Sequence, residues 1–68
     1  GTLDVASAED VLIAKLEWAK QGASDRQIDD AAGIVRIQGD RLDTAYVERW
    51  VTALDLGDQW REARARSV

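Results

Sequence analysis

The sequence predicts an all-α fold, a small antiparallel three-helix bundle with a short fourth helix at its C-terminal end. Apolar residues recur every three to four positions along most of the chain, which is the period of an α-helix. Residues that can cap a helix, and glycines that can end one, separate these segments, and the chain contains no proline. We therefore expect helices over residues 8–21, 25–38, 44–55 and 59–66, and no sheet.

The first expected helix carries a lysine where the pattern asks for an apolar residue. Ser7 can cap this helix, and Gly22 suits its C-terminal end. Its apolar residues fall on one continuous arc, which comprises Ala14, Trp18, Val11, Ala8, Ala19, Leu12 and Leu16. Lys15 falls near the middle of this arc. An amine in that position must reach solvent, pair with a carboxylate or take part in chemistry.

The later helices have their own end signals and apolar faces. The expected caps and stops are Ser24 with Gln27, Gly39, Asp43, Gly57 and Asp58. The expected core-facing residues are Ile28, Ala31, Ala32, Ile34, Val35 and Ile37 in the second helix, Tyr46, Val47, Trp50, Val51, Ala53 and Leu54 in the third, and Trp60 and Ala63 in the last. Short loops between such helices favour antiparallel packing.

The three tryptophans are expected to anchor the core, because the chain has no phenylalanine. Trp18, Trp50 and Trp60 each lie on a predicted apolar face. The alternative is that one of them lies in a docking surface for a partner or for a missing domain.

Length and composition exclude several classes of site and partner. Residues 1–68 are enough for one domain. The absence of Cys and His removes disulfides, thiolate metal sites and the usual zinc ligand, so we expect no metal site in this chain. The net charge of −4 argues against binding to nucleic acid. No apolar run approaches a membrane span and no signal sequence is evident, which makes the cytoplasm the default location.

A second charged residue shares the unusual placement of Lys15. Asp29 lies on the polar side of the second helix, whereas Asp30 projects between Ile34 and Ile37 at the rim of the apolar arc. Because the two helices are antiparallel neighbours, we expect Lys15 and Asp30 to lie close together. They form either a structural ion pair or half of an active site, in which a lysine holds a phosphate and an aspartate holds a metal or orients a base.

Short motifs around these residues resemble a known family. Glu9-Asp10-Val11-Leu12, Lys15-Leu16, and Arg26 with Asp30 occur in that order in the string ASAEDVLIAKLEWAKQGASDRQIDDAAGIV. This string resembles the C-terminal helical part of bacterial nucleotidyltransferase-fold proteins, which include abortive-infection-type toxins and many uncharacterised relatives. The following GDRLDTAYVERWVTALDL resembles the tail that is common in the uncharacterised relatives.

The resemblance implies catalytic roles for two residues, but only within a complete parent protein. The lysine and aspartate of these motifs are implicated in catalysis in the toxins, which here indicates Lys15 and Asp30. Arg26, which matches the second motif, and Trp18, which could lie in a docking surface, are the candidate binding residues. The family holds its metal-binding acids on a sheet that follows a Gly-Ser helix start, and neither a Gly-Ser pair nor an Asp-x-Asp strand occurs here. Magnesium and a nucleotide are therefore expected only in the complete fold, and this chain alone has no cofactor.

Two interpretations of function follow. In the first, the chain is an excised C-terminal helical domain, with residues 1–7 as a tail or the remnant of a strand, and its partner is a missing N-terminal domain that completes a nucleotide site. In the second, it is a small stand-alone interaction module with no enzymatic role, which binds another protein or forms a homodimer to cover its apolar surface.

Overall fold

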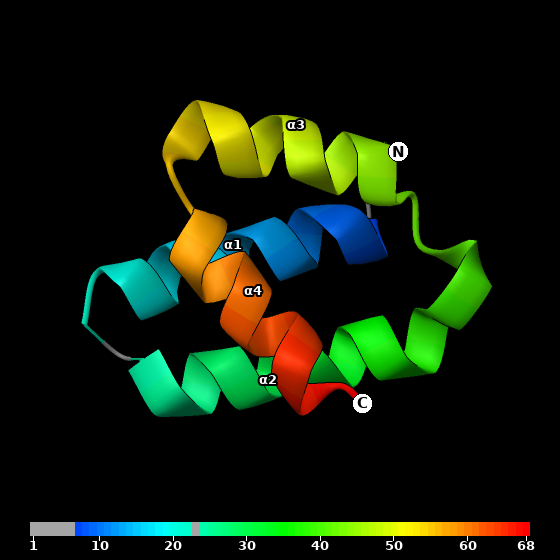
Figure 1. Ribbon diagram of the computed structural model, residues 1–68, viewed down its shortest axis with the longest axis horizontal. Helices are drawn as coiled ribbons and strands as arrows, with labels where there is room; N and C mark the ends of the chain where they lie inside the picture. The colour runs from blue at the N-terminus through cyan, green and yellow to red at the C-terminus, as the bar shows by residue number, and fades with distance from the viewer. Residues whose placement is uncertain (1–6, 23) are drawn as a thin grey trace, which may run out of the picture.

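The computed structural model describes residues 7–22 and 24–68, and within these residues all regular structure is helical (Figure 1). The elements are α1 (Ala8–Lys20), α2 (Ser24–Gln38), the short 3-10 helix η1 (Gly39–Arg41), α3 (Thr44–Leu54) and α4 (Gly57–Arg66). The all-α prediction is confirmed. The tail or strand expected over residues 1–7 lies outside the described residues, with the exception of Ser7. The side chain of Ser24, which was expected to cap α2, is also not described.

Helix α1 lies between α2 and α3, and the chain reverses direction from α1 to α2 and again from α2 to α3 (Figure 1). Helix α4 then crosses the layer and packs on α2, α1 and α3. The domain measures 32 × 24 × 21 Å. Because α4 packs on all three of the other main helices, it is a structural part of the bundle, although only Trp60 and Ala63 formed its expected apolar face.

Local hydrogen bonds define the starts of α1 and α3. Ser7 caps α1 by accepting a bond from the amide of Asp10, and Asp43 caps α3 by accepting one from Tyr46, both at 3.1 Å. Helix α3 ends at Leu54, within one residue of the expected boundary at Asp55, but its C-cap is Asp55 and not the expected Gly57. Asp55 has a left-handed conformation (φ 57°, ψ 53°), which aspartate adopts more readily than most residues.

Helix α4 also starts differently from the prediction. It begins at Gly57, and its N-cap is Leu56, which has no side-chain acceptor, so the cap expected from Asp58 is wrong. Leu56 is instead buried in the core, and so is Leu42 in the connection before α3. Patterns of helical period miss such residues because they lie between helices.

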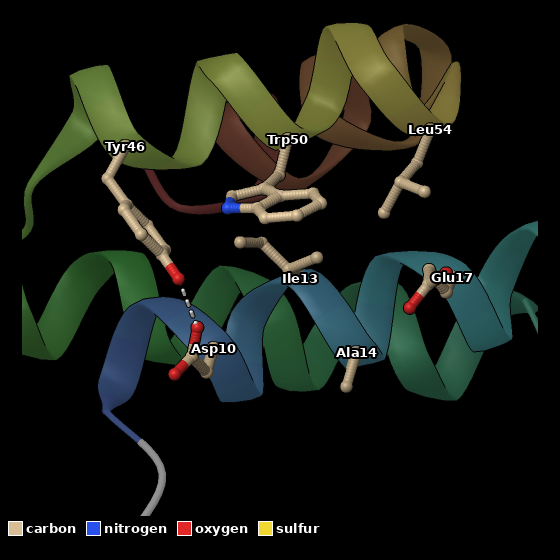
Figure 2. Close-up of a pocket in the computed structure, with 7 residues that line it drawn as sticks. All are labelled: Asp10, Ile13, Ala14, Glu17, Tyr46, Trp50 and Leu54. Carbon is tan, nitrogen blue, oxygen red and sulfur yellow. Dashed lines mark hydrogen bonds between the residues drawn. The ribbon is translucent and has the colours of Figure 1, made fainter.

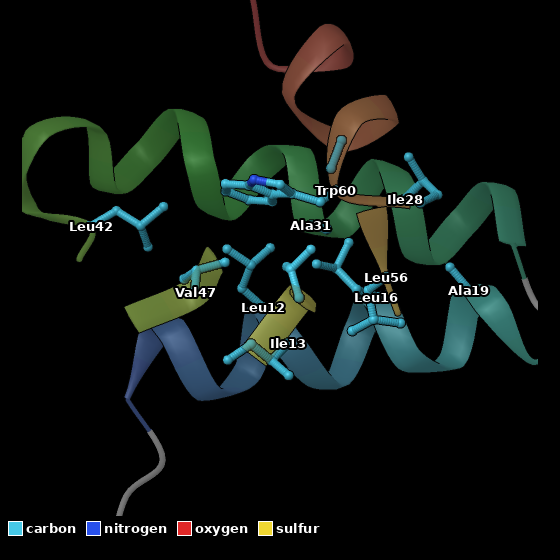
Figure 3. Packing of buried hydrophobic residues seen from close by; sticks show 12 residues of the cluster. Leu12, Ile13, Leu16, Ala19, Ile28, Ala31, Leu42, Val47, Leu56 and Trp60 are labelled. Atoms are coloured by element: carbon cyan, nitrogen blue, oxygen red, sulfur yellow. The ribbon is translucent and has the colours of Figure 1, made fainter. Parts of the chain in front are cut away.

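The core lies where α1 meets the other three main helices (Figure 3). Its members are Leu12, Ile13, Leu16, Ala19, Ile28, Ala31, Leu42, Val47, Val51, Leu56, Trp60 and Ala63. The buried face of α1 therefore includes Ile13, which the predicted arc left out, and excludes Val11 and Trp18. The true arc is rotated away from the predicted one because α3 and α4 pack on the side of α1 that carries Ile13 and Leu16.

The tryptophans do not all serve the core. Trp60 is 7% exposed and buried as expected, but Trp50 is 41% and Trp18 is 54% exposed, so core packing is the wrong interpretation for these two. Ile37, at the edge of the predicted face of α2, is 79% exposed. A domain of this size has too little interior to enclose every large side chain on its helices.

The end of α4 is tied to α2 by a single arginine. Arg66 contacts the carboxylates of Asp29 at 2.9 Å, Asp25 at 3.3 Å and Glu62 at 2.9 Å. Hydrogen bonds to Glu62, Asp29 and Asp25 raise the pKa of the Arg66 guanidinium above its already high ordinary value. Arg66 therefore has a structural role, because it joins the C-terminal end of α4 to α2.

Candidate functional site

Lys15 and Asp30 form the expected pair. The Lys15 Nζ atom donates a hydrogen bond to Oδ2 of Asp30 at 3.2 Å, across the antiparallel α1–α2 contact. The predicted closeness of the two side chains is confirmed. The pair is not buried, because the side chains are 25% and 45% exposed, so Lys15 lies at the border of the core and not in its middle. An ion pair that water reaches contributes little to stability, typically about 1 kcal/mol or less.

The ammonium of Lys15 also lies over an aromatic ring. It is 5.8 Å from the ring centroid of Trp18, one helical turn further along α1. A cation over the face of an indole is attracted by the negative face of the ring. Lys15 is therefore held by a carboxylate on one helix and by a half-exposed indole on its own helix. These contacts explain how a lysine is accommodated beside the core without assigning it any chemistry.

Exposed apolar side chains surround this pair. Val11 and Trp18 are seven residues apart in α1, and Asp30 and Ile37 are seven apart in α2, so each pair shares one side of its helix. Val11 is 37% exposed, and Trp18 and Ile37 more so. We call this surface the α1–α2 face, defined by Val11, Lys15, Trp18, Asp30 and Ile37. It combines apolar groups with one charge of each sign.

Arg26, the other candidate binding residue, is exposed on α2, one helical turn before Asp30. The structure thus brings Lys15, Asp30 and Trp18 together, and it places Arg26 beyond Asp30 along the same side of α2. Whether any of these residues binds a ligand stays a prediction.

A groove between α1 and α3 forms a second surface (Figure 2). It has a volume of about 330 Å³ and is lined by Asp10, Ile13, Ala14, Glu17, Tyr46, Trp50 and Leu54. Figure 2 shows the Trp50 ring lying above Ile13, with Asp10 and Glu17 toward the two ends. A second hollow of about 360 Å³ shares Glu17 and Leu54 with the first and continues toward Lys20.

The walls of this groove are joined at both ends. At one end the Tyr46 hydroxyl donates to Oδ1 of Asp10 at 2.7 Å, and the Asp43 amide donates to Glu9 at 2.8 Å. At the other end Lys20 donates to the carbonyl of Asp55 at 2.8 Å, where α3 ends. The hydrogen bond to Asp10, followed by desolvation, raises the pKa of the Tyr46 phenol above its ordinary value.

Sequence reasoning missed this groove because it treated its two walls separately. It assigned Tyr46 and Trp50 to the core and considered the first helix apart from them. The available signal was the spacing, since residues 46, 50 and 54 form one row along α3, and residues 10, 13, 14 and 17 form another along α1. Two rows that mix acids and aromatics indicate a half-open contact between helices.

Two further structural findings concern metals and membranes. Within residues 7–22 and 24–68, no three His, Cys, Asp or Glu side chains come together in a way that could hold a metal ion. In the same part of the chain no helix is both long enough and apolar enough to cross a membrane.

No protein-family model matches this chain, and comparisons with curated proteins and with solved structures found no match either. The resemblance to the helical part of nucleotidyltransferase-fold proteins thus stays a prediction from short motifs.

Proposed function

We propose that this domain is a protein-interaction module that pairs with a second copy of itself through the α1–α2 face. The observation that carries the proposal is the exposure of Trp18, which lies 54% open to solvent beside the Lys15–Asp30 pair. Tryptophan is strongly enriched among the residues that dominate protein interfaces. Val11 and Ile37, which lie on the other side of this pair along the antiparallel helices, add exposed apolar surface to the same face.

The α1–α2 face has the composition that a two-fold interface requires. In such an interface the same patch meets itself, so it must be self-complementary. With a two-fold axis near Lys15 and antiparallel α1 helices, Trp18 of one copy meets Val11 of the other. The face carries one cation and one anion, so Lys15 of each copy can also approach Asp30 of its partner. The two opposite charges of each copy then offset the repulsion between the two lysines and between the two aspartates.

Sedimentation equilibrium of the 68-residue chain, from micromolar to millimolar concentration, tests this proposal. We expect a reversible dimer that Trp18→Ser weakens by about tenfold or more, as loss of a central interface tryptophan does. Trp50→Ser is the matched control, because it removes a comparably exposed tryptophan from the α1–α3 groove and should leave the dimer unchanged. A wild-type chain that stays monomeric at millimolar concentration would overturn the proposal.

A second function is favoured by the exposure of the Lys15–Asp30 pair. A half-site has to remain accessible to the domain that completes it, and these side chains are 25% and 45% exposed. In this alternative the same face docks on a sheet domain, Lys15 contacts a nucleotide phosphate, Asp30 orients a reacting group or a magnesium ion, and Arg26 and Trp18 contribute to binding.

Titration of the labelled chain with magnesium and ATP, followed by nuclear magnetic resonance, separates the two functions. Shifts at Lys15, Asp30 and Arg26 that disappear in Lys15→Met favour the half-site. Spectra that change with protein concentration but not with nucleotide favour the homodimer.

A further inference from the structure

We propose that the α1–α3 groove is a second binding site, which receives a basic amphipathic helix from another protein. The α1–α2 face lies elsewhere on the molecule, and this proposal does not depend on the homodimer. The groove has an apolar base, an aromatic wall and an acidic rim, and each of these features restricts the chemistry of its occupant.

The acidic rim is open to a cationic partner. Among the described residues neither Asp10 nor Glu17 is paired with a cation, in contrast to the carboxylates of Asp30, Asp55, Asp58, Glu48 and Asp25. Tyr46 occupies only one of the two oxygens of Asp10, and each carboxylate oxygen can accept more than one hydrogen bond. The net charge of −4 adds a long-range attraction for a basic partner.

The spacing of these carboxylates suggests how the partner is arranged. Asp10 and Glu17 are seven residues apart in α1, which places them on one side of the helix about 10 Å apart along its axis. A partner helix with basic residues at positions i and i+7 has the same spacing. A helix laid between two others presents side chains at i, i+3, i+4 and i+7. The residues between the two cations would then face the centre of the groove.

The centre of the groove is suited to these intervening residues. Trp50 is 41% exposed and lies above Ile13, between the two carboxylates (Figure 2). Its ring can pack against apolar side chains and against the aliphatic stem of a lysine or arginine. A guanidinium or ammonium that reaches a carboxylate beside the ring also gains a cation–π contact.

The groove is already formed before a partner binds. Bonds from Tyr46 to Asp10 and from the Asp43 amide to Glu9 hold one end, and Lys20 holds the other end through the carbonyl of Asp55. A site with fixed walls loses little conformational entropy on binding, which favours affinity from a small contact area.

Isothermal titration with a synthetic helical peptide tests the proposal. The peptide carries Arg at positions i and i+7 and Leu at i+3 and i+4, and a second peptide of equal composition has the arginines moved out of this spacing. We expect the first peptide to bind at least tenfold more tightly than the second. Its amide shifts should map to Asp10, Ile13, Glu17 and Trp50.

Three variants of the chain complete the test. Glu17→Gln should weaken binding about threefold, as expected for a charge at an exposed rim. Asp40→Asn on η1 changes the net charge equally and should have no effect. Trp50→Ala should weaken binding about tenfold, with circular dichroism to confirm that it folds. Glu17→Gln keeps the test decisive if Trp50→Ala does not fold.

Three results would overturn the proposal. The first is equal affinity for the two peptides or no binding at all. The second is an equal effect of Glu17→Gln and Asp40→Asn. The third is a dimer that dissociates in Trp50→Ser, because a second copy of the chain would then occupy this groove.

Discussion

Lys15 shows how one residue can contradict a helical pattern and still fit the fold. Placed on the apolar arc by periodicity, it lies at the border of the core, bonded to Asp30 at 3.2 Å and beside the ring of Trp18. The contradiction came from an arc drawn through Val11 and Trp18, which are exposed. A lysine at such a border keeps its charged end in water while its stem covers apolar surface.

Because the Lys15–Asp30 pair is partly exposed, removing one partner should cost little. We expect Lys15→Met and Asp30→Asn each to change the free energy of unfolding by about 1 kcal/mol or less. Leu16→Ala, next to Lys15 but fully buried, should cost about 2–5 kcal/mol. Urea unfolding of the three variants measures this. A loss of about 3–5 kcal/mol in either charge variant would indicate a buried structural pair instead.

Tyr46 offers a direct test of the groove, because it is the only tyrosine in the sequence. The hydrogen bond to Asp10 raises the pKa of its phenol above the ordinary value of 10.0. The folded-state pKa is raised, so this contribution to stability is complete below about pH 10 and is lost as pH rises through the folded-state value. Spectrophotometric titration should show this pKa falling in Asp10→Asn and unchanged in Asp40→Asn. An unchanged titration in Asp10→Asn would show that the bond is absent in solution.

At the scale of the element, the helices were predictable and their faces only partly so. The caps Ser7 and Asp43 locate two helix starts because a local side-chain bond decides each. The face of α1 was misplaced because burial depends on which neighbours pack on it, and periodicity cannot tell an apolar residue that meets α3 from one that meets solvent. The α1–α3 groove went unpredicted for the same reason, although the Lys15–Asp30 contact did follow from antiparallel α1 and α2.

Replacement of glycine by alanine should stabilise the domain at one position, Gly33, and destabilise it at another, Gly39. Gly33 lies within α2, and a Cβ atom there would meet no atom within 4 Å. Gly33→Ala should raise the free energy of unfolding by about 0.5–1 kcal/mol, because alanine loses less backbone entropy in a helix. Gly39 has a φ of +50°, a conformation that residues with a Cβ atom adopt at a cost. Gly39→Ala should therefore lower the free energy of unfolding by about 1 kcal/mol. Thermal unfolding of both variants provides the measurement, and destabilisation by Gly33→Ala would mean that α2 packs against something else in solution.

At the scale of the whole molecule, the two open surfaces of α1 are the consequence of a small interior. Four helices can enclose the residues around Leu12, Leu16 and Trp60, but they leave Trp18 and Trp50 exposed on two different surfaces, the α1–α2 face and the α1–α3 groove. Exposed apolar surfaces of this kind are typical of sites where proteins meet a partner, which is the basis of both proposals. Each surface has its own charge pattern, balanced on the α1–α2 face and acidic in the groove, so the two need not serve the same partner.

We expect the 68-residue chain not to transfer nucleotides, whichever interpretation of the α1–α2 face holds. Its sequence contains no Gly-Ser helix start and no Asp-x-Asp strand, which in the resembled family supply the nucleotide and metal contacts. Incubation of the chain with labelled nucleoside triphosphates, magnesium and total RNA should leave the RNA unlabelled. Metal-dependent labelling that increases with protein concentration and disappears in Lys15→Met would contradict this expectation, and it would assign the pair to catalysis.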